Sequence, residues 1–341
     1  MPCTRPTTLQ PDEPYLDTAE INGIAWKSPS QAFINAGWNT IENIDALPMP
    51  AYDLAKWERY APSAHRDLGR PFLPLITARG CPNSCSYCVV HGRYRLHSIE
   101  YIDKLLRAST EMYDAAIRNI IVWDDTFTVP EGRCNRLAEL FFQYGAGYTI
   151  NTSTWFWSRE QARILKDSGC EVVFFGVESC DPDVLKNFGR RTTPREIEKA
   201  FRIARDCEIL TVGSVMVGTP YDTRETIERN VNYLIENIQP DLAFFSHFAA
   251  TPGSACYREC VIKGVVPPYR DWLSRTDSEF CLTPPPYTPS ANRGLSKNEI
   301  DELVNWAYRR FYTQTRMEML YELSKGRSFL KGAISRIERA I

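Results

Sequence analysis

Residues 81–88 read Cys81-Pro-Asn-Ser-Cys85-Ser-Tyr-Cys88, and this C-x3-C-x2-C run decides how the rest of the chain is interpreted. It follows a short apolar segment, residues 72–78, which we expect to be a β-strand. A loop at that place can curl three thiolates around one centre. Such soft ligands favour zinc or iron–sulfur.

The number of cysteines separates these two metals. A structural zinc site needs four ligands and normally a second paired Cys or His element, whereas His91 and His97 are single residues. Three cysteines suit a 4Fe-4S cubane in which one iron has no protein ligand. That iron can chelate an amine and a carboxylate, and the methionine part of S-adenosylmethionine (SAM) carries both. Zinc or inert thiols are the alternative interpretation.

Strand-like and helix-like segments alternate from residue 72 onward. Six strand–helix units imply parallel strands with right-handed crossovers. Six are fewer than a closed eight-unit barrel needs, so we predict an α/β fold, a partial (β/α)6 TIM-like barrel with function at the C-terminal ends of its strands. After 72–78, the expected strands are residues 119–123, 148–152, 171–177, 209–217 and 241–248. The expected helices are residues 98–116, 130–144, 158–168, 181–188, 194–206, 223–237 and 254–263.

The segments on either side of this core differ from it in composition. Residues 1–70 are Pro-rich and are expected to form an extended lead-in with one hairpin. Residues 71–283 form the predicted barrel domain, which ends at a Pro-rich break. Residues 284–341 form a predicted helical region, with one long helix at 295–323 and another at 328–340. We expect both to pack on the barrel or cap its open side, with contact to a partner as the alternative.

Composition excludes several functional classes. The 341 residues carry a formal net charge of −2 and no basic block, so no nucleic-acid partner is expected. No signal peptide and no run of about 18 apolar residues is present, which predicts a cytoplasmic protein without a membrane span. The 11 cysteines are an odd number without the spacing of a disulfide framework.

The cysteine run, its place after the first strand, and Tyr87 before the third cysteine resemble the radical SAM superfamily. The resemblance spans roughly residue 42 to the C-terminus and is clearest between residues 72 and 253. It implies a 4Fe-4S cluster on Cys81, Cys85 and Cys88 that binds SAM at the exposed iron. The reduced cluster would pass an electron to the sulfonium, giving methionine and a hydrogen-abstracting 5′-deoxyadenosyl radical. A flavodoxin or ferredoxin would supply the electron.

The ends of the second and fourth expected strands resemble SAM-binding segments of this family. Asp124 and Asp125 stand where the family often has a Gly-Gly-Glu-like segment that meets the amino group of SAM, and helix capping is the alternative. Glu178 and Ser179 belong to a Gly-x-Glu-Ser-like segment that would face the ribose and methionine of SAM, with a surface turn as the alternative. The resemblance also counts Tyr87 among the cofactor-binding residues.

Three further positions match the family pattern. Arg190 could pair with the carboxylate of SAM, or it could be a solvated charge at a helix end. Gly218 lies in a turn that resembles the family's Gly-x-Pro turn near adenine. Thr251 begins a Thr-Pro-Gly turn similar to the family's Pro-Gly-Thr turn. Ordinary turn chemistry explains Gly218 and Thr251 as well.

Some residues outside these motifs are weaker candidates. Cys256 and Cys260 share one face of an expected helix and could hold a second cluster with Cys281, although cysteines are commonly just buried. Three more residues could face substrate, with core packing as the alternative: Trp155, Trp157 and His247.

Residues 41–54 and the Asp-Asp-Thr-Phe segment at 124–127 resemble the cobalamin-binding subfamily. Its cobalamin domain has more than a hundred residues, whereas about 40 residues precede the resembling linker here. We therefore expect a fragment, a separate cobalamin-binding partner chain, or an enzyme that works without cobalamin.

The resemblance implies an enzyme that acts on a small molecule or natural-product precursor by C-methylation, cyclisation or oxidation. A tRNA or protein methylthiotransferase is an alternative, but that family needs an N-terminal cysteine-bearing domain, and Cys3 alone precedes the cluster here. It also needs a C-terminal RNA-binding barrel, whereas this tail is expected to be helical. The third alternative is a non-catalytic metal-binding scaffold.

Overall fold

A computed structural model of the chain describes residues 40–54, 72–90, 94–113, 119–268, 291–325, 328–338 and 341. The chain divides into two compact units, residues 1–46 and 47–341. In the first unit, the described residues 40–46 contain the 3-10 helix η2, Ile44–Ala46. The expected hairpin and the Pro-rich break lie outside the described residues. Everything below concerns the second unit.

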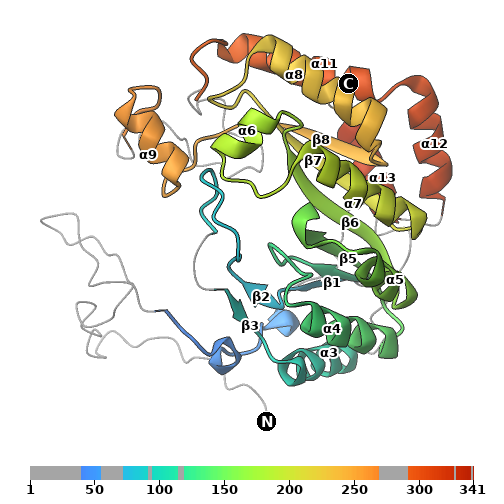
Figure 1. Ribbon diagram of the computed structural model, residues 1–341. Helices are drawn as coiled ribbons and strands as arrows, with labels where there is room; N and C mark the ends of the chain where they lie inside the picture. The colour runs from blue at the N-terminus through green and yellow to red at the C-terminus, as the bar shows by residue number, and fades with distance from the viewer. Residues whose placement is uncertain are drawn as a thin grey trace, which may run out of the picture. The chain divides into compact units, whose positions relative to one another are not determined.

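The second unit is built on a six-stranded sheet in which every pair of neighbouring strands is parallel (Figure 1). The strands follow one another across the sheet in the order β1-β4-β5-β6-β7-β8. This confirms the predicted open α/β architecture with six parallel strands. The strands are β1 (Phe72–Leu75), β4 (Asn119–Val122), β5 (Gly147–Thr152), β6 (Cys170–Glu178), β7 (Leu210–Val217) and β8 (Leu242–His247).

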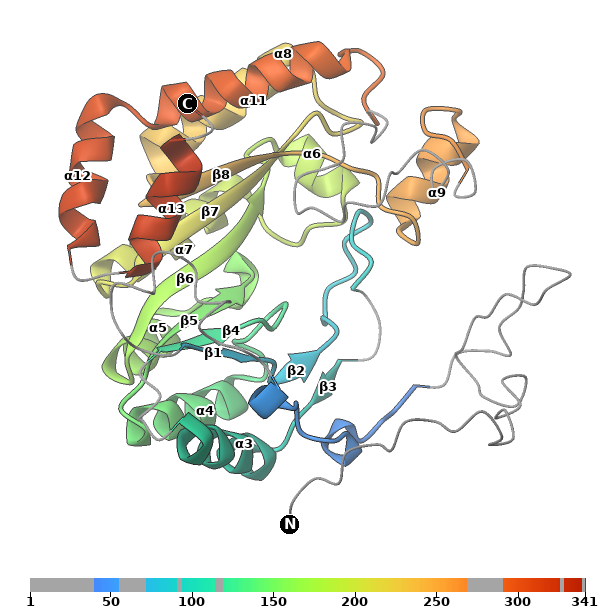
Figure 2. The same ribbon diagram turned by 180° about the vertical axis from the view of Figure 1, so that it is seen from behind.

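Helices line one side of the sheet, as Figures 1 and 2 show from opposite directions. The helices between strands are α3 (Ile99–Tyr113), α4 (Glu131–Gln143), α5 (Arg159–Asp167), α6 (Pro182–Asn187), α7 (Pro194–Asp206) and α8 (Arg224–Tyr233), which continues as the π-helical turn η5 (Leu234–Ile238). After β8 come α9 (Ala255–Ile262), α11 (Lys297–Phe311), α12 (Gln314–Ser324) and α13 (Ser328–Glu338). Among the described residues, no helix is long and apolar enough to cross a bilayer.

Local signals fix where several of these helices begin. The Ser158 hydroxyl accepts a hydrogen bond from the backbone of Gln161 at the start of α5. Thr193 and Glu196 form a reciprocal capping box at the start of α7, with Pro194 in the first turn. These caps satisfy backbone N–H groups that would otherwise lack partners at a helix N-terminus. They explain why the predicted helix starts are close to the observed ones.

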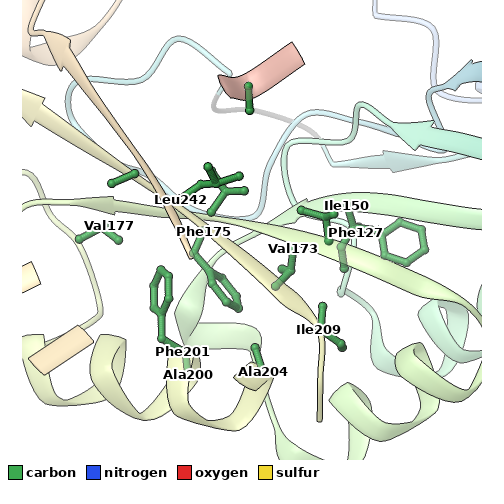
Figure 3. Packing of buried hydrophobic residues seen from close by; sticks show 14 of the residues in the cluster. Phe127, Ile150, Val173, Phe175, Val177, Ala200, Phe201, Ala204, Ile209 and Leu242 are labelled. Carbon is green, nitrogen blue, oxygen red and sulfur yellow. The ribbon is translucent and has the colours of Figure 1, made fainter. Parts of the chain in front are cut away.

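The hydrophobic core lies between the sheet and these helices. Figure 3 shows Phe175 of β6 beside Phe201 of α7, and their ring centroids are 4.9 Å apart. Gly213 of β7 leaves room for this contact, since a Cβ there would approach the Phe201 ring to 3.3 Å. Close packing between sheet and helices holds the strand ends in fixed positions.

The first predicted strand, residues 72–78, is wrong in its extent. The structure splits it into β1 and a separate two-residue strand, β2 (Ala78–Arg79), which pairs with β3 (Arg95–Leu96). The cause is at Thr77, whose backbone N–H donates to Asp124 Oδ1 at 2.6 Å instead of to a neighbouring strand. The cysteine run therefore begins in the loop between β2 and β3.

The predicted long helix at residues 295–323 is also wrong, because the chain breaks between α11 and α12. Tyr312 leaves helical geometry with φ −94° and ψ 73°. Its hydroxyl donates to the carbonyl of Ala243 in β8 at 2.8 Å and accepts from the N–H of the same residue at 2.9 Å. Burial of the Tyr312 side chain against β8 stabilises the fold more than one further helical turn would, so α11 ends here. The Thr313 hydroxyl then caps the N-terminus of α12.

The turn between β7 and α8 is tied to the segment before α11. The Thr219 N–H donates to Asp222 Oδ2 at 2.8 Å, and the Asn292 amide donates to the carbonyls of Thr219 and Asp222 at 2.6 and 2.9 Å. Asp222 Oδ1 is buried without a hydrogen-bond partner in the described part of the chain. Burial raises the pKa of Asp222 from 3.8 to about 6.

This carboxyl gives a pH prediction. The folded state binds its proton more tightly than the unfolded state does, so Asp222 makes the free energy of unfolding fall as pH rises from about 4 through about 6. The pKa difference corresponds to about 3 kcal/mol. Asp222→Asn stays neutral and keeps an oxygen acceptor, so its stability relative to wild type should rise with pH. Urea unfolding at pH 4 and pH 8 measures this, and an equal difference at both pH values would contradict it.

Candidate cluster and cofactor site

The cysteine loop and the C-terminal ends of β4 to β7 surround a cavity of about 310 Å³. This is the edge of a parallel sheet at which partial and complete (β/α) barrels place their sites. Its lining residues come from the loop, four strand ends and the segment after α6: Cys81, Asn83, Cys85, Tyr87, Cys88, Asp125, Thr126, Asn151, Thr152, Ser153, Phe174, Phe175, Gly176, Glu178, Arg190 and Ser214.

All three cysteine sulfurs of the run have polar neighbours. Cys81 Sγ lies 3.3 Å from the Thr126 hydroxyl oxygen and accepts from the Asn83 amide at 3.6 Å. Cys88 Sγ accepts from the backbone N–H of Val90 at 3.3 Å. Donors directed at sulfur stabilise thiolates and, in iron–sulfur proteins, adjust the cluster's reduction potential.

The backbone of the cysteine loop is anchored on both sides. The Ser86 N–H donates to the Phe188 carbonyl at 2.9 Å, and the Ser86 carbonyl accepts from the Cys256 N–H at 2.8 Å. The rings of Tyr87 and Phe188 meet edge to face, with centroids 5.0 Å apart. In Figures 1 and 2 the loop accordingly rises from β2 toward α6 and α9. Contacts to two helices thus fix the position of the cysteine loop.

The donor set fits a cubane. Among the described residues, no three His, Cys, Asp or Glu side chains come together around a single metal ion. A 4Fe-4S cluster does not require this, because each cysteine binds a different iron. Three thiols of one loop on the wall of one cavity, with donors directed at their sulfurs, supply what such a cluster needs from the protein.

The two adjacent aspartates lie in different surroundings. Asp124 does not line the cavity: its carboxylate accepts from the N–H groups of Thr77 and Ala78 at 2.6 and 3.0 Å and from the Thr77 hydroxyl. Burial raises its pKa, while these hydrogen bonds and nearby Arg133 oppose the rise. Asp124 therefore braces the base of the cysteine loop. Asp125 lines the cavity, and partial burial raises its pKa.

Glu178, Tyr87 and Arg190 form a polar cluster on the cavity wall. Burial raises the pKa of Glu178, and the Arg190 guanidinium and a hydrogen bond with Tyr87 oppose the rise. Glu178 has φ 66°, a left-handed conformation that is uncommon outside glycine, at an irregular point of the pairing between β6 and β7. Gly176 makes room for it, since a Cβ there would overlap with the Glu178 carboxylate oxygen. Backbone strain of this kind clusters at functional sites.

Besides Asp124, three of the residues assigned by resemblance do not line the cavity. The Ser179 hydroxyl accepts from the Asn230 amide at 2.9 Å and from the Asp181 N–H at 3.1 Å. Gly218 has φ +81°, and a Cβ there would collide with Ile300 of α11. Thr251 is exposed, and its hydroxyl donates to the Ala249 carbonyl at 3.3 Å.

The weaker candidates also lie away from the cavity. Trp157 is buried with its ring edge to face on Phe175, and Trp155 is exposed. His247 Nε2 lies 2.6 Å from Asp301 Oδ1 of α11. Cys256 and Cys260 are buried in a small apolar cluster around α9, and Cys281 lies outside the described residues.

Sequence reasoning missed the polar contribution of two strands. Asn151, Thr152 and Ser153 at the end of β5, and Ser214 of β7, line the cavity, and so does Thr126 after β4. Apart from Thr126, which belongs to the Asp-Asp-Thr-Phe segment, they match no family motif. The signal that could have found them is position alone, because small polar residues at the C-terminal ends of parallel strands face a shared edge.

Comparison with known proteins agrees with this geometry. Residues 75–234 match the model of the Radical SAM superfamily. An uncharacterized methyltransferase of Pyrococcus horikoshii is 26% identical over 303 residues, which cover 87% of this chain and 62% of the relative. The anaerobic magnesium-protoporphyrin IX monomethyl ester cyclase of Cereibacter sphaeroides is 24% identical, over 93% of this chain and 52% of the relative. The chain thus spans little more than half the length of these curated relatives.

Solved structures share the fold. The cobalamin-dependent SAM radical enzyme OxsB, with aqua-cobalamin and SAM bound, superposes with a TM-score of 0.64 at 14% identity, over 93% of this chain and 52% of that one. The radical SAM methyltransferase TsrM from Kitasatospora setae gives 0.57 at 18% identity, over 72% of this chain and 50% of that one. The match to the family model over residues 75–234 and the shared fold confirm the expected resemblance to the radical SAM superfamily.

Proposed function

We propose that this chain is a radical SAM enzyme that holds a 4Fe-4S cluster on Cys81, Cys85 and Cys88 and cleaves SAM reductively. The observation that carries the proposal is the placement of three thiols on one wall of a cavity at the catalytic edge of the sheet. When bound, the cluster would supply the electron that breaks the carbon–sulfur bond of SAM to give methionine and a 5′-deoxyadenosyl radical.

The other cavity residues provide the groups that SAM needs. Asp125 offers a carboxylate to the amino group of the methionine part, since a charged pair of this kind is stronger than a neutral hydrogen bond. Glu178 offers a carboxylate to the ribose hydroxyls. Phe174 and Phe175 make part of the wall apolar, which limits the access of water to the reaction.

The reaction class is proposed from the relatives. Their names divide between methyltransferases and cyclases, which favours C-methylation or ring closure on a small molecule. An external one-electron donor of the flavodoxin or ferredoxin type would supply the electron. None of the nine described cysteines forms a disulfide, which is compatible with the proposed cytoplasmic location.

The test is SAM cleavage by anaerobically reconstituted protein. After addition of iron, sulfide, dithionite and SAM, we expect 5′-deoxyadenosine, measured by liquid chromatography. A preparation that binds zinc but no iron, and forms no 5′-deoxyadenosine, would instead support the metal-binding scaffold.

Glu178→Gln tests the cofactor side of the cavity. Loss of a charged hydrogen-bond acceptor costs about 1.5–3 kcal/mol, so SAM should bind at least about tenfold more weakly by equilibrium dialysis. Glu171→Gln is the matched control, because Glu171 is an exposed residue at the opposite end of the same strand, β6. Equal SAM affinity in the two variants would show that Glu178 does not contribute to SAM binding.

A further inference from the structure

Arg190 is held in one place beside the cysteine loop. It follows Gly189, whose φ of 68° turns the chain after α6, and its own N–H donates to the Leu185 carbonyl at 2.9 Å. Its side chain runs back to β6, where Nη2 donates to the Gly176 carbonyl at 2.6 Å. The guanidinium is therefore anchored to the backbone of a central strand.

The same guanidinium reaches a cluster ligand. Nη1 of Arg190 lies 3.9 Å from Cys85 Sγ, in hydrogen-bonding geometry. Cys85 is the most buried of the three cysteines in the run, at 8% exposed. The contacts of Cys81 Sγ, by contrast, are with the neutral side chains of Thr126 and Asn83.

The opposing charge is also close. Glu178 and Arg190 line the same cavity, and their charged groups both lie beside Gly176 of β6. The two side chains thus place a cation and an anion of fixed position beside the cluster loop. In a partly buried cavity, charges at such distances interact more strongly than in water.

We propose that Arg190 raises the reduction potential of the cluster and that Glu178 lowers it. Reduction adds one electron from an external low-potential donor to the cluster and breaks no bond. Part of the added negative charge lies on the cysteine sulfurs, so a cation at Cys85 Sγ favours the reduced form, and a nearby carboxylate disfavours it. This rests on the proposed cluster and gives Arg190 a role before SAM binds.

This role is separable from pairing with SAM. Two of the three guanidinium nitrogens contact Gly176 and Cys85, and Nε is buried without a hydrogen-bond partner in the described residues. A contact with SAM alone would leave the potential of the SAM-free cluster unaffected by Arg190. The potential measured without SAM therefore reports on the proposed role.

The experiment is a potentiometric titration of the reconstituted cluster without SAM, followed by EPR. In Arg190→Gln we expect the equilibrium constant for one-electron reduction to fall about tenfold, a shift of about 59 mV. Glu178→Gln should shift the potential in the opposite direction, and Arg190→Lys should lie between Arg190→Gln and wild type. The matched control is Arg191→Gln, an exposed neighbour outside the cavity lining, which should equal wild type.

The outcomes distinguish this proposal from the proposed function. If reconstituted wild-type protein contained no iron, the proposed cluster itself would be contradicted. Full iron content in Arg190→Gln with an unchanged potential would overturn only the role of Arg190. If Arg190→Gln does not assemble a cluster, Glu178→Gln decides, and an unchanged or lower potential there overturns the proposal.

Discussion

Replacing Cys85 by alanine is expected to abolish the cluster while leaving the fold intact. A cubane site that loses one of three thiolates cannot retain its irons stably, so bound iron should fall from about four per chain to nearly none. 5′-Deoxyadenosine formation should fall to the level of protein-free controls. The cost in folding free energy should be only about 1 kcal/mol, because a small side chain is truncated by one atom.

Cys180→Ala is the matched control for this result. Cys180 is 7% exposed, almost the same as Cys85, and lies two residues beyond β6 but outside the cavity lining. Its variant should keep full iron content and SAM cleavage. Iron analysis and visible absorption measure both variants, and iron retained in Cys85→Ala would contradict the ligand assignment.

Asp124→Ala is expected to give the largest loss of stability among these variants. It removes the acceptor for the N–H groups of Thr77 and Ala78 and for the Thr77 hydroxyl, all in a buried setting. Unsatisfied buried donors cost about 1–3 kcal/mol each, so a loss of about 3 kcal/mol or more is expected. Iron occupancy should also fall, because these residues form the base of the cysteine loop.

The adjacent residue provides the contrast. Asp125 lines the cavity and is partly exposed, so Asp125→Ala should change the free energy of unfolding by no more than about 0.5 kcal/mol. It should instead weaken SAM binding. Urea unfolding and equilibrium dialysis on both variants test this division of roles, and equal losses of stability would contradict it.

The helices and strands that could be predicted from the sequence are those whose determining residues lie close to them in the chain. The starts of α5 and α7 follow from Ser158, Thr193 and Pro194, each within a few residues of the helix it caps. The two errors came from contacts distant in sequence. Thr77 bonds to a carboxylate 47 residues away, and Tyr312 bonds to a strand residue 69 residues away. Neither partner can be identified from local pattern.

The site was predictable where residue chemistry and strand position agree. The three cysteines, Tyr87, Asp125, Glu178 and Arg190 all line the cavity. Asp124 shows what motif matching omits: Ile120 and Val122 are buried in β4, and the two-residue period places Asp124 on the same side. Because side chains alternate between the two faces of a strand, this period distinguishes Asp124 from Asp125. The resemblance to the family assigns both aspartates to SAM and does not distinguish them.

The claim that the cluster has one iron without a protein ligand is tested most directly by Mössbauer spectroscopy. Protein reconstituted with 57Fe should show a 4Fe-4S cluster in which added SAM changes the signal of one iron and leaves the other three unchanged. Four irons that do not respond to SAM, or no cluster in anaerobic wild-type protein, would contradict the account.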